Sequence, residues 1–184
     1  MTLSIHYGTI LSPNYLPLAL QKCYNHHMSI TIRKATKNDI KLVQQFGFEL
    51  LDYERQNWDP TLEADWPFSE AGKKAYEKAI NEKYTIIAED EKKHPVGFLI
   101  GKIVRPDKDA ARKVTIAQLE NIFVYPDSRE KNIGKQLFEH FKSYCKTEGV
   151  NKINVTVNAK NTTAIKFYEK TNFSPSRLFL SQEI

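Results

Sequence analysis

Residues Ser128–Leu137, with the sequence SREKNIGKQL, combine residue types that bind phosphate groups. The segment follows an apolar stretch typical of a strand and opens a stretch with helical spacing. The first backbone N–H groups of a helix have no partner within the helix, and the helix dipole adds partial positive charge there. Gly134 lets a ligand approach the backbone closely, while Arg129, Lys131 and Lys135 add positive charge nearby. These residues predict an anion-binding loop built from backbone N–H groups.

Apolar periodicity predicts the elements that position this loop. Strands are expected at 30–32, 84–89, 96–104, 114–124, 152–157 and 177–181, and helices at 39–55, 69–81, 133–148 and 162–170. Ser69 and Asn161 are expected to cap two of the helices. Strands joined by short loops should pair antiparallel, whereas a helical crossover implies one parallel pair. The order β-α-α-β-β-β-α-β-α-β therefore predicts an α/β fold with helices flanking a mixed sheet.

The composition is that of an ordinary globular domain, with 41% hydrophobic and 27% charged residues in a chain of 184. No apolar run approaches the ~20 residues that span a membrane, so no membrane partner is expected. Cys23 and Cys145 are too few for a disulfide framework, which favours a cytoplasmic location. Cys23, His26 and His27 lie together, but no second cluster completes four ligands, and no metal site is predicted.

Two segments match a known pattern. Residues 124–126 read Val-Tyr-Pro and are followed by Arg129-x-x-Asn132-x-Gly134, which resembles the pyrophosphate loop Arg/Gln-x-x-Gly-x-Gly/Ala of the GNAT acetyltransferases. Asn132 replaces the first glycine of that loop, and asparagine tolerates left-handed backbone better than most residues. Residues 158–173, NAKNTTAIKFYEKTNF, resemble the family segment N-x-x-N-x-x-A-x-x-F-Y-x-x-x-G-F. The resemblance covers roughly residues 30–182 and implies the GNAT fold, with a mixed, mostly antiparallel sheet.

The resemblance also implies a site for acetyl-CoA. The N–H groups of residues 129–134 would hold the pyrophosphate, and strand residues 122–124 would pair with the pantetheine arm as an added strand does. Asn161 would bond to that arm, and Tyr168 would lie near the thioester sulfur. The cofactor-binding residues implied are Ile122, Phe123, Val124, Arg129, Glu130, Lys131, Asn132, Ile133, Gly134, Lys135, Asn161 and Tyr168.

Acetyl transfer to an amine requires a neutral nucleophile, so the site must remove a proton from the ammonium. Tyr168 is suited to protonate the departing sulfur; the alternative is a tyrosine packed beneath the short helix. Glu120 is the candidate base, since a carboxylate on an apolar strand needs a reason to be there. It also resembles a glutamate on the matching strand of diamine acetyltransferases. The alternatives are a salt bridge on the sheet surface, or Asn121 or Gln118 acting through an ordered water.

The acceptor would bind at the loop after the first helix. Tyr53, Trp58, Asp59 and Trp66 are the candidate residues there, because a carboxylate and aromatic faces suit a cationic amine. The alternative is a solvated acidic loop whose tryptophans serve the core. The acceptor is predicted to be a small-molecule amine or a peptide, and a homodimer is left open.

The function predicted is direct transfer of an acetyl group from acetyl-CoA to a primary amine in a ternary complex. One alternative is a GNAT module that binds acyl-CoA without catalysis, as a sensor or scaffold. A second is a basic nucleic-acid-binding domain, since the net charge is +5. The lysines lack the clustering of a recognised nucleic-acid module, so no nucleic-acid partner is expected.

Residues 1–27 contain no acidic residue and no sustained apolar period, and they are expected to be an extension outside the core. The acetyltransferase domain would span residues 28–184. A chain that begins at Met28 should therefore keep its melting temperature and its CoA affinity. A loss of several degrees, or of binding, measured by scanning calorimetry and titration calorimetry would show that the extension packs on the domain.

Overall fold

A computed structural model describes residues 29–105, 114–129 and 131–182. The expected extension at 1–27, and with it Cys23, His26 and His27, lies outside the described residues, as does Glu130.

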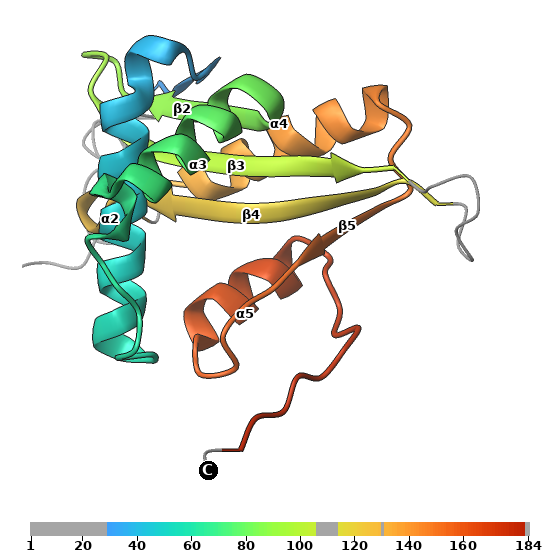
Figure 1. The fold of residues 1–184 in the computed structure, drawn as a ribbon. Coiled ribbons are helices and arrows are strands. Elements are labelled where there is room, and N and C mark those ends of the chain that lie inside the picture. The colour runs from blue at the N-terminus through green and yellow to red at the C-terminus, as the bar shows by residue number, and fades with distance from the viewer. Residues whose placement is uncertain (1–28, 106–113, 130, 183–184) are drawn as a thin grey trace, which may run out of the picture.

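The described residues form a five-stranded sheet in the order β1-β2-β3-β4-β5. The strands are β1 (Thr31–Lys34), β2 (Tyr84–Glu89), β3 (Pro95–Val104), β4 (Ile116–Val124) and β5 (Lys152–Val155). The first three pairings are antiparallel, and β4 pairs parallel with β5. The predicted mixed, mostly antiparallel sheet is therefore confirmed, including the parallel pair that the helical crossover requires (Figure 1).

Helices cover both faces of this sheet. They are η2 (Lys37–Asp39), α2 (Ile40–Asn57), η3 (Trp66–Phe68), α3 (Glu70–Glu82), η4 (Pro126–Ser128), α4 (Ile133–Thr147) and α5 (Thr162–Lys170). The predicted caps are confirmed, because the Ser69 side chain accepts from the Gly72 N–H and the Asn161 side chain from the Ala164 N–H. Both asparagines that replace family glycines adopt left-handed backbone, with φ of 60° at Asn132 and 68° at Asn172.

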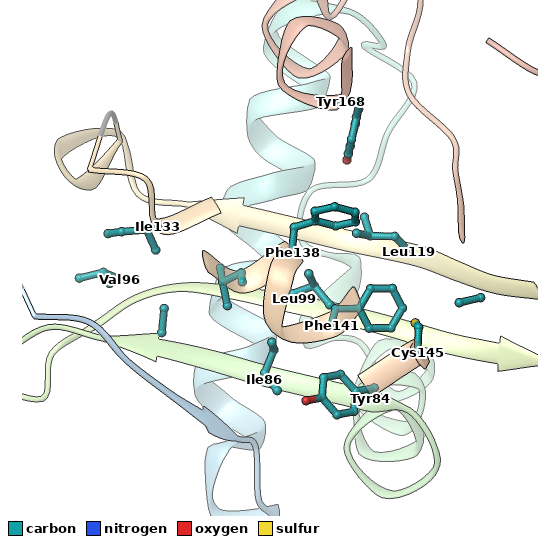
Figure 2. Packing of buried hydrophobic residues seen from close by; sticks show 13 residues of the cluster. Tyr84, Ile86, Val96, Leu99, Leu119, Ile133, Phe138, Phe141, Cys145 and Tyr168 are labelled. Atoms are coloured by element: carbon teal, nitrogen blue, oxygen red, sulfur yellow. The ribbon is translucent and has the colours of Figure 1, made fainter. Parts of the chain in front are cut away.

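Two apolar clusters, one on each face, hold the helices to the sheet. Helices α2 and α3 pack on one face, where Phe46 stacks on Phe98 with ring centroids 5.0 Å apart. Helix α4 packs on the other face through Leu137 and Phe141, which are fully buried and one helical turn apart. Figure 2 shows Phe141 and Phe138 of this helix within the cluster. Each such side chain contributes about 1.5–3 kcal/mol through burial. The sheet is thus fixed on both sides, and the ends of its strands are held in place.

Strands β4 and β5 diverge after a short pairing. Residues Ile116–Leu119 of β4 pair with Lys152–Val155 of β5. The pairing of β4 with β3, in contrast, continues as far as Val124. Beyond Leu119, β5 leaves the sheet, and α5 lies on the side of β4 that β5 has vacated (Figure 1). We call residues Glu120–Val124 the open edge of β4, since no described strand pairs with them on that side.

The strand predicted at residues 177–181 is wrong. Residues 174–182 contain no strand and run away from the sheet (Figure 1). Leu178, Phe179 and Leu180 are 81%, 92% and 80% exposed. An apolar run acquires strand structure only when another strand satisfies its backbone, and no described strand pairs with this segment.

Candidate active site

The open edge of β4 presents unpaired backbone groups. The N–H of Tyr125 donates to the Val96 carbonyl of β3 at 3.1 Å, so Tyr125 and Phe123, two residues earlier, face β3. The backbone groups of Ile122 and Val124 therefore face the other way, toward the space that β5 has vacated. Of the three residues predicted to pair with an extended ligand, Ile122 and Val124 face this space and Phe123 does not. The Val124 carbonyl already accepts a hydrogen bond from Arg129, so Val124 offers its N–H.

The N-terminus of α4 lies at the end of this edge and offers free N–H groups. Asn132 occupies the N-cap position, but no described side chain caps the helix. The first N–H groups of α4 consequently have no helical partner. The side chain of Ile133 is only 1% exposed, so its burial in the core fixes the position of the backbone where the loop joins α4. Lys131 and Lys135 are exposed beside it.

Arg129 does not contribute as predicted. Its own N–H donates to the Pro126 carbonyl at 3.1 Å and is not free for an anion. Its side-chain Nε donates to the Val124 carbonyl at 3.1 Å, and its guanidinium lies 5.0 Å from the centre of the Tyr53 ring. Arg129 therefore ties the loop to β4 and to the C-terminal part of α2, and the N–H groups that begin α4 are the ones left free for an anion.

Gly134 keeps the space between these elements open. A Cβ atom at Gly134 would lie 3.5 Å from Cε2 of Phe167 on α5 and 3.9 Å from Cγ2 of Val124 on β4. These are ordinary contact distances, so the fold itself does not require glycine here. A side chain would occupy the space beside the free N–H groups, where a phosphate must approach. The loop, the open edge and this space together fit the pyrophosphate and pantetheine parts of CoA.

Tyr168 lies on α5 opposite the open edge. Its side chain is 8% exposed, and its hydroxyl points from α5 toward β4 (Figure 2). No described residue forms a hydrogen bond with that hydroxyl, whereas the ring packs edge-on against Phe167 and Phe173. Burial raises the pKa of Tyr168 above its ordinary value, and the Glu54 carboxylate raises it further. The phenol therefore keeps its proton at neutral pH.

Asn161 has a structural task besides the predicted one. Its Oδ1 atom accepts a hydrogen bond of 2.9 Å from the Ala164 N–H and so caps α5. This bond holds the helix that carries Tyr168. The side-chain NH2 group of Asn161 is still able to donate a hydrogen bond to the arm of a bound cofactor.

Glu120, the predicted base, lies at a bulge in β4 and forms two ion pairs. The register of β3 and β4 shifts so that Asn121 pairs with Ile100 and Leu119 with Gly101, leaving Glu120 without a partner residue. Its carboxylate accepts from Lys83 at 2.6 Å and from Lys102 at 2.7 Å. Burial alone would raise the pKa of Glu120, but the two lysines outweigh it and hold that pKa below its ordinary value. The geometry matches the salt-bridge alternative of the sequence analysis.

Replacing Glu120 by glutamine should lower the free energy of unfolding by about 1 kcal/mol, or roughly 2–4 °C in Tm, because both lysines lose their partner. Since the pKa of Glu120 is lowered in the folded state, its ion pairs stabilise the fold above the unfolded pKa. This contribution is lost as the pH falls through the lowered pKa. Calorimetry across pH should therefore show the full Tm difference at neutral pH and none in acid. Glu82→Gln, which breaks only an exposed pair with Lys78, is the matched control and should change Tm little at any pH.

The predicted acceptor residues are only partly brought together. Tyr53 and Trp58 pack edge to face, with ring centroids 5.1 Å apart, at the C-terminal end of α2. Asp59 follows them, and two hydrogen bonds from Thr61 hold its pKa below the ordinary value. Trp66 belongs to η3 and packs against Tyr76 of α3, with centroids 6.2 Å apart. Tyr53, Trp58 and Asp59 thus form one group, to which Trp66 does not belong.

Glu54 belongs to the acidic and aromatic stretch where the acceptor is predicted to bind, but no individual role was predicted for it. It lies on α2 between Tyr53 and the aromatic loop, and it is half-buried. Burial raises the pKa of Glu54, and the nearby charge of Asp59 raises it further. The signal in the sequence is its spacing, because Val43, Gly47, Leu50 and Glu54 continue one face of the helix. A carboxylate at the next position of an apolar face is a candidate for a function.

Residues 50–173 match the model of the acetyltransferase (GNAT) family. The chain belongs to this family. The match includes β4, the loop before α4, and α5 with Tyr168, so the elements that form the site are those the family shares. The GNAT fold expected from the resemblance is confirmed.

Similar proteins agree with this assignment. An uncharacterized N-acetyltransferase of Methanocaldococcus jannaschii is 29% identical over 161 residues, which are 84% of this chain and 65% of that relative. The BH1408 protein of Bacillus halodurans has the same fold, with a TM-score of 0.75 at 18% identity, covering 84% of this chain and 99% of that one. The aminoglycoside N-acetyltransferase AAC(6')-Iy in complex with CoA has a TM-score of 0.63 at 19% identity, covering 85% and 95%. The chain therefore spans about two thirds of the curated relative it matches.

Within residues 29–105, 114–129 and 131–182, no helix is both long enough and apolar enough to cross a membrane. The same residues contain no group of three or more His, Cys, Asp or Glu side chains placed to hold a metal ion.

Proposed function

We propose that this GNAT-family chain is an N-acetyltransferase that transfers an acetyl group from acetyl-CoA to a primary amine of a small molecule or peptide. The observation that carries the proposal is the meeting of three features at one place. These are the open edge of β4, the uncapped start of α4, and the unpaired hydroxyl of Tyr168, which points toward β4.

Different residues of the chain would bind the cofactor, orient it and move a proton. The first N–H groups of α4 bind the pyrophosphate, with Gly134 leaving room beside them. The backbone groups of Ile122 and Val124 orient the pantetheine arm as a neighbouring strand would. Acetyl-CoA, when bound, supplies the acetyl group as a reactive thioester. Tyr168 holds a proton at its hydroxyl oxygen for the departing sulfur, and burial keeps that proton in place.

Direct transfer in a ternary complex follows from the nucleophiles present. Cys145, the cysteine among the described residues, is 2% exposed and lies on the side of α4 that faces the core. Burial raises the pKa of its thiol to about 11, so it remains a thiol at neutral pH. A buried thiol cannot reach a substrate to carry the acetyl group. Direct attack of the acceptor amine on the thioester is the route that we propose.

The test is release of free thiol from acetyl-CoA with a panel of amines that includes polyamines, amino acids, aminoglycosides and peptides. Each reaction product is identified by mass spectrometry as the amine gaining one acetyl group. The proposal expects turnover with at least one amine class and none without an amine. CoA binding by calorimetry without thiol release on any amine would instead support the non-catalytic acyl-CoA-binding module.

The aminoglycoside N-acetyltransferase of similar fold makes aminoglycosides a natural first member of the panel. The aromatic and acidic residues at the end of α2 support a cationic acceptor, through charge and cation–π attraction. Affinity for DNA or RNA that falls steeply with salt, in place of thiol release, would favour the nucleic-acid alternative.

A further inference from the structure

Glu54 and Tyr168 belong to α2 and α5, two helices that reach the same side of β4 (Figure 1). The charge of Glu54 acts on the Tyr168 hydroxyl, which places the two groups within electrostatic reach of each other. The C-terminal half of α2 continues past β4 to the side where α5 lies (Figure 1). Glu54 is therefore on the same side of the open edge as Tyr168.

Two features of this place indicate a cationic ligand. Glu54 is half-buried, and none of the described lysines, arginines or histidines forms an ion pair with it. Asp59 lies close enough to add a second negative charge. The hydroxyl of Tyr168, a side chain that is more than nine-tenths buried, points toward β4 and has no hydrogen-bond partner among the described residues. No buried side-chain nitrogen or oxygen of the described residues is left unsatisfied, so this hydroxyl oxygen is still open enough to be reached by a ligand.

We propose that Glu54 receives the acceptor's ammonium group beside Tyr168 and takes its proton, so that the neutral amine attacks the thioester. The proposal rests on the proposed function and names a residue for the base that Glu120 was predicted to be. Asp59 strengthens the attraction for the cation, and the Tyr53 and Trp58 rings, packed edge to face, lie next to Glu54 and Asp59 in the chain.

The protons balance as follows. The acceptor loses two protons while its new C–N bond forms and the C–S bond breaks. One proton passes to the Glu54 carboxylate and from there to water. Tyr168 gives its own proton to the sulfur and regains one from the nitrogen. The products are the amide, the free thiol and one proton released to solvent.

Glu54 and Glu120 differ in their fitness as bases. A general base works best when its pKa lies near the operating pH. Burial and Asp59 raise the pKa of Glu54, whereas Lys83 and Lys102 hold that of Glu120 down. Asp59 on the following loop and Tyr168 on α5 are the groups whose charge is coupled to Glu54. A cation at this end of α2 is Arg129, whose guanidinium lies over the ring of Tyr53 and forms no ion pair with Glu54 among the described residues. Glu120 is already neutralised by two lysines and would attract an ammonium group weakly.

The first arm of the test follows carboxyl signals by NMR in protein labelled with carbon-13 at the glutamate side chains. The Glu54 and Glu120 signals are assigned from Glu54→Gln and Glu120→Gln. We expect Glu54 to titrate above the ordinary glutamate pKa and Glu120 below it. At pH 7, n-butylamine as the probe should shift the Glu54 signal and leave that of Glu77, an exposed glutamate of α3, unchanged. A Glu54 signal that titrates at or below the ordinary value, or ignores the amine, overturns the proposal.

The second arm measures kcat/KM for the best acceptor of the amine panel. Glu54→Gln should lower kcat/KM by about 10- to 100-fold at neutral pH, with partial recovery as the pH rises toward the pKa of the amine. Glu77→Gln is the matched control and should be unaffected. A Glu54→Gln enzyme with wild-type kcat/KM, or with a deficit that does not change with pH, overturns the proposal.

The two hypotheses fail separately. If no amine supports thiol release by the wild-type protein, the proposed function fails, and the NMR titration with n-butylamine still decides whether Glu54 binds an ammonium group. If the wild type is active and Glu54→Gln is equally active, the enzyme assignment stands and the role of Glu54 is wrong. The wild-type titration also keeps the proposal testable if Glu54→Gln does not fold.

Discussion

Replacing Tyr168 by phenylalanine should lower kcat by about 10- to 1,000-fold while the fold and the CoA affinity persist. The change removes one hydroxyl and keeps the ring, which packs against Phe167 and Phe173. Because no described residue forms a hydrogen bond with that hydroxyl, its loss leaves no partner unsatisfied in the core. The departing sulfur, in contrast, would lose its proton donor. Steady-state kinetics, Tm and CoA calorimetry on the same preparation separate these effects.

Tyr144→Phe provides the matched control for this prediction. Tyr144 lies on α4, where its ring stacks on Tyr84 with centroids 3.9 Å apart, and it belongs to the face away from α2 and α3. The same chemical change there should leave kcat as it is in the wild type. Undiminished kcat in Tyr168→Phe would contradict the acid assignment, provided that a pre-steady-state burst is absent and chemistry limits turnover.

Local patterns predicted most of the fold because they depend on neighbours in the chain. The spacing of Leu137 and Phe141 defines α4, and the caps at Ser69 and Asn161 define two helix starts. The same reasoning failed for residues 177–181. A strand depends on a partner that sequence spacing does not reveal, and an apolar run without one remains extended and exposed.

The site was predictable only where it depends on one segment. The loop before α4 and the position of Tyr168 could be read from adjacent residues. The direction of the Phe123 backbone could not, because it is set by the pairing of β4 with β3. The ion pairs of Glu120 and the charge coupling of Glu54 to Tyr168 join residues far apart in the sequence. Charge environments that arise from tertiary contacts are therefore the basis on which we propose Glu54 rather than Glu120 as the base.

Replacing Gly134 by valine should weaken CoA binding by about 10- to 100-fold, because the branched side chain would occupy the space beside the free N–H groups of α4. Displacing a phosphate from one such group costs roughly the 1.5–3 kcal/mol of a hydrogen bond to a charged group. Titration calorimetry with CoA measures the change directly. Arg129→Ala should weaken binding less, since Arg129 acts on the loop through the Val124 carbonyl and the Tyr53 ring.

Gly134→Ala separates a binding defect from a folding defect. Alanine is favoured over glycine in helices by about 1 kcal/mol, and its Cβ would make only ordinary contacts, 3.5 Å from Phe167. Gly134→Ala should therefore keep or raise Tm while it lowers CoA affinity by less than valine does. A higher Tm together with a lower CoA affinity would indicate that ligand binding, and not the fold, requires glycine at this position. Unchanged CoA affinity in both variants would mean that the pyrophosphate lies elsewhere, and equal losses of Tm and affinity would mean that the valine acts through the fold.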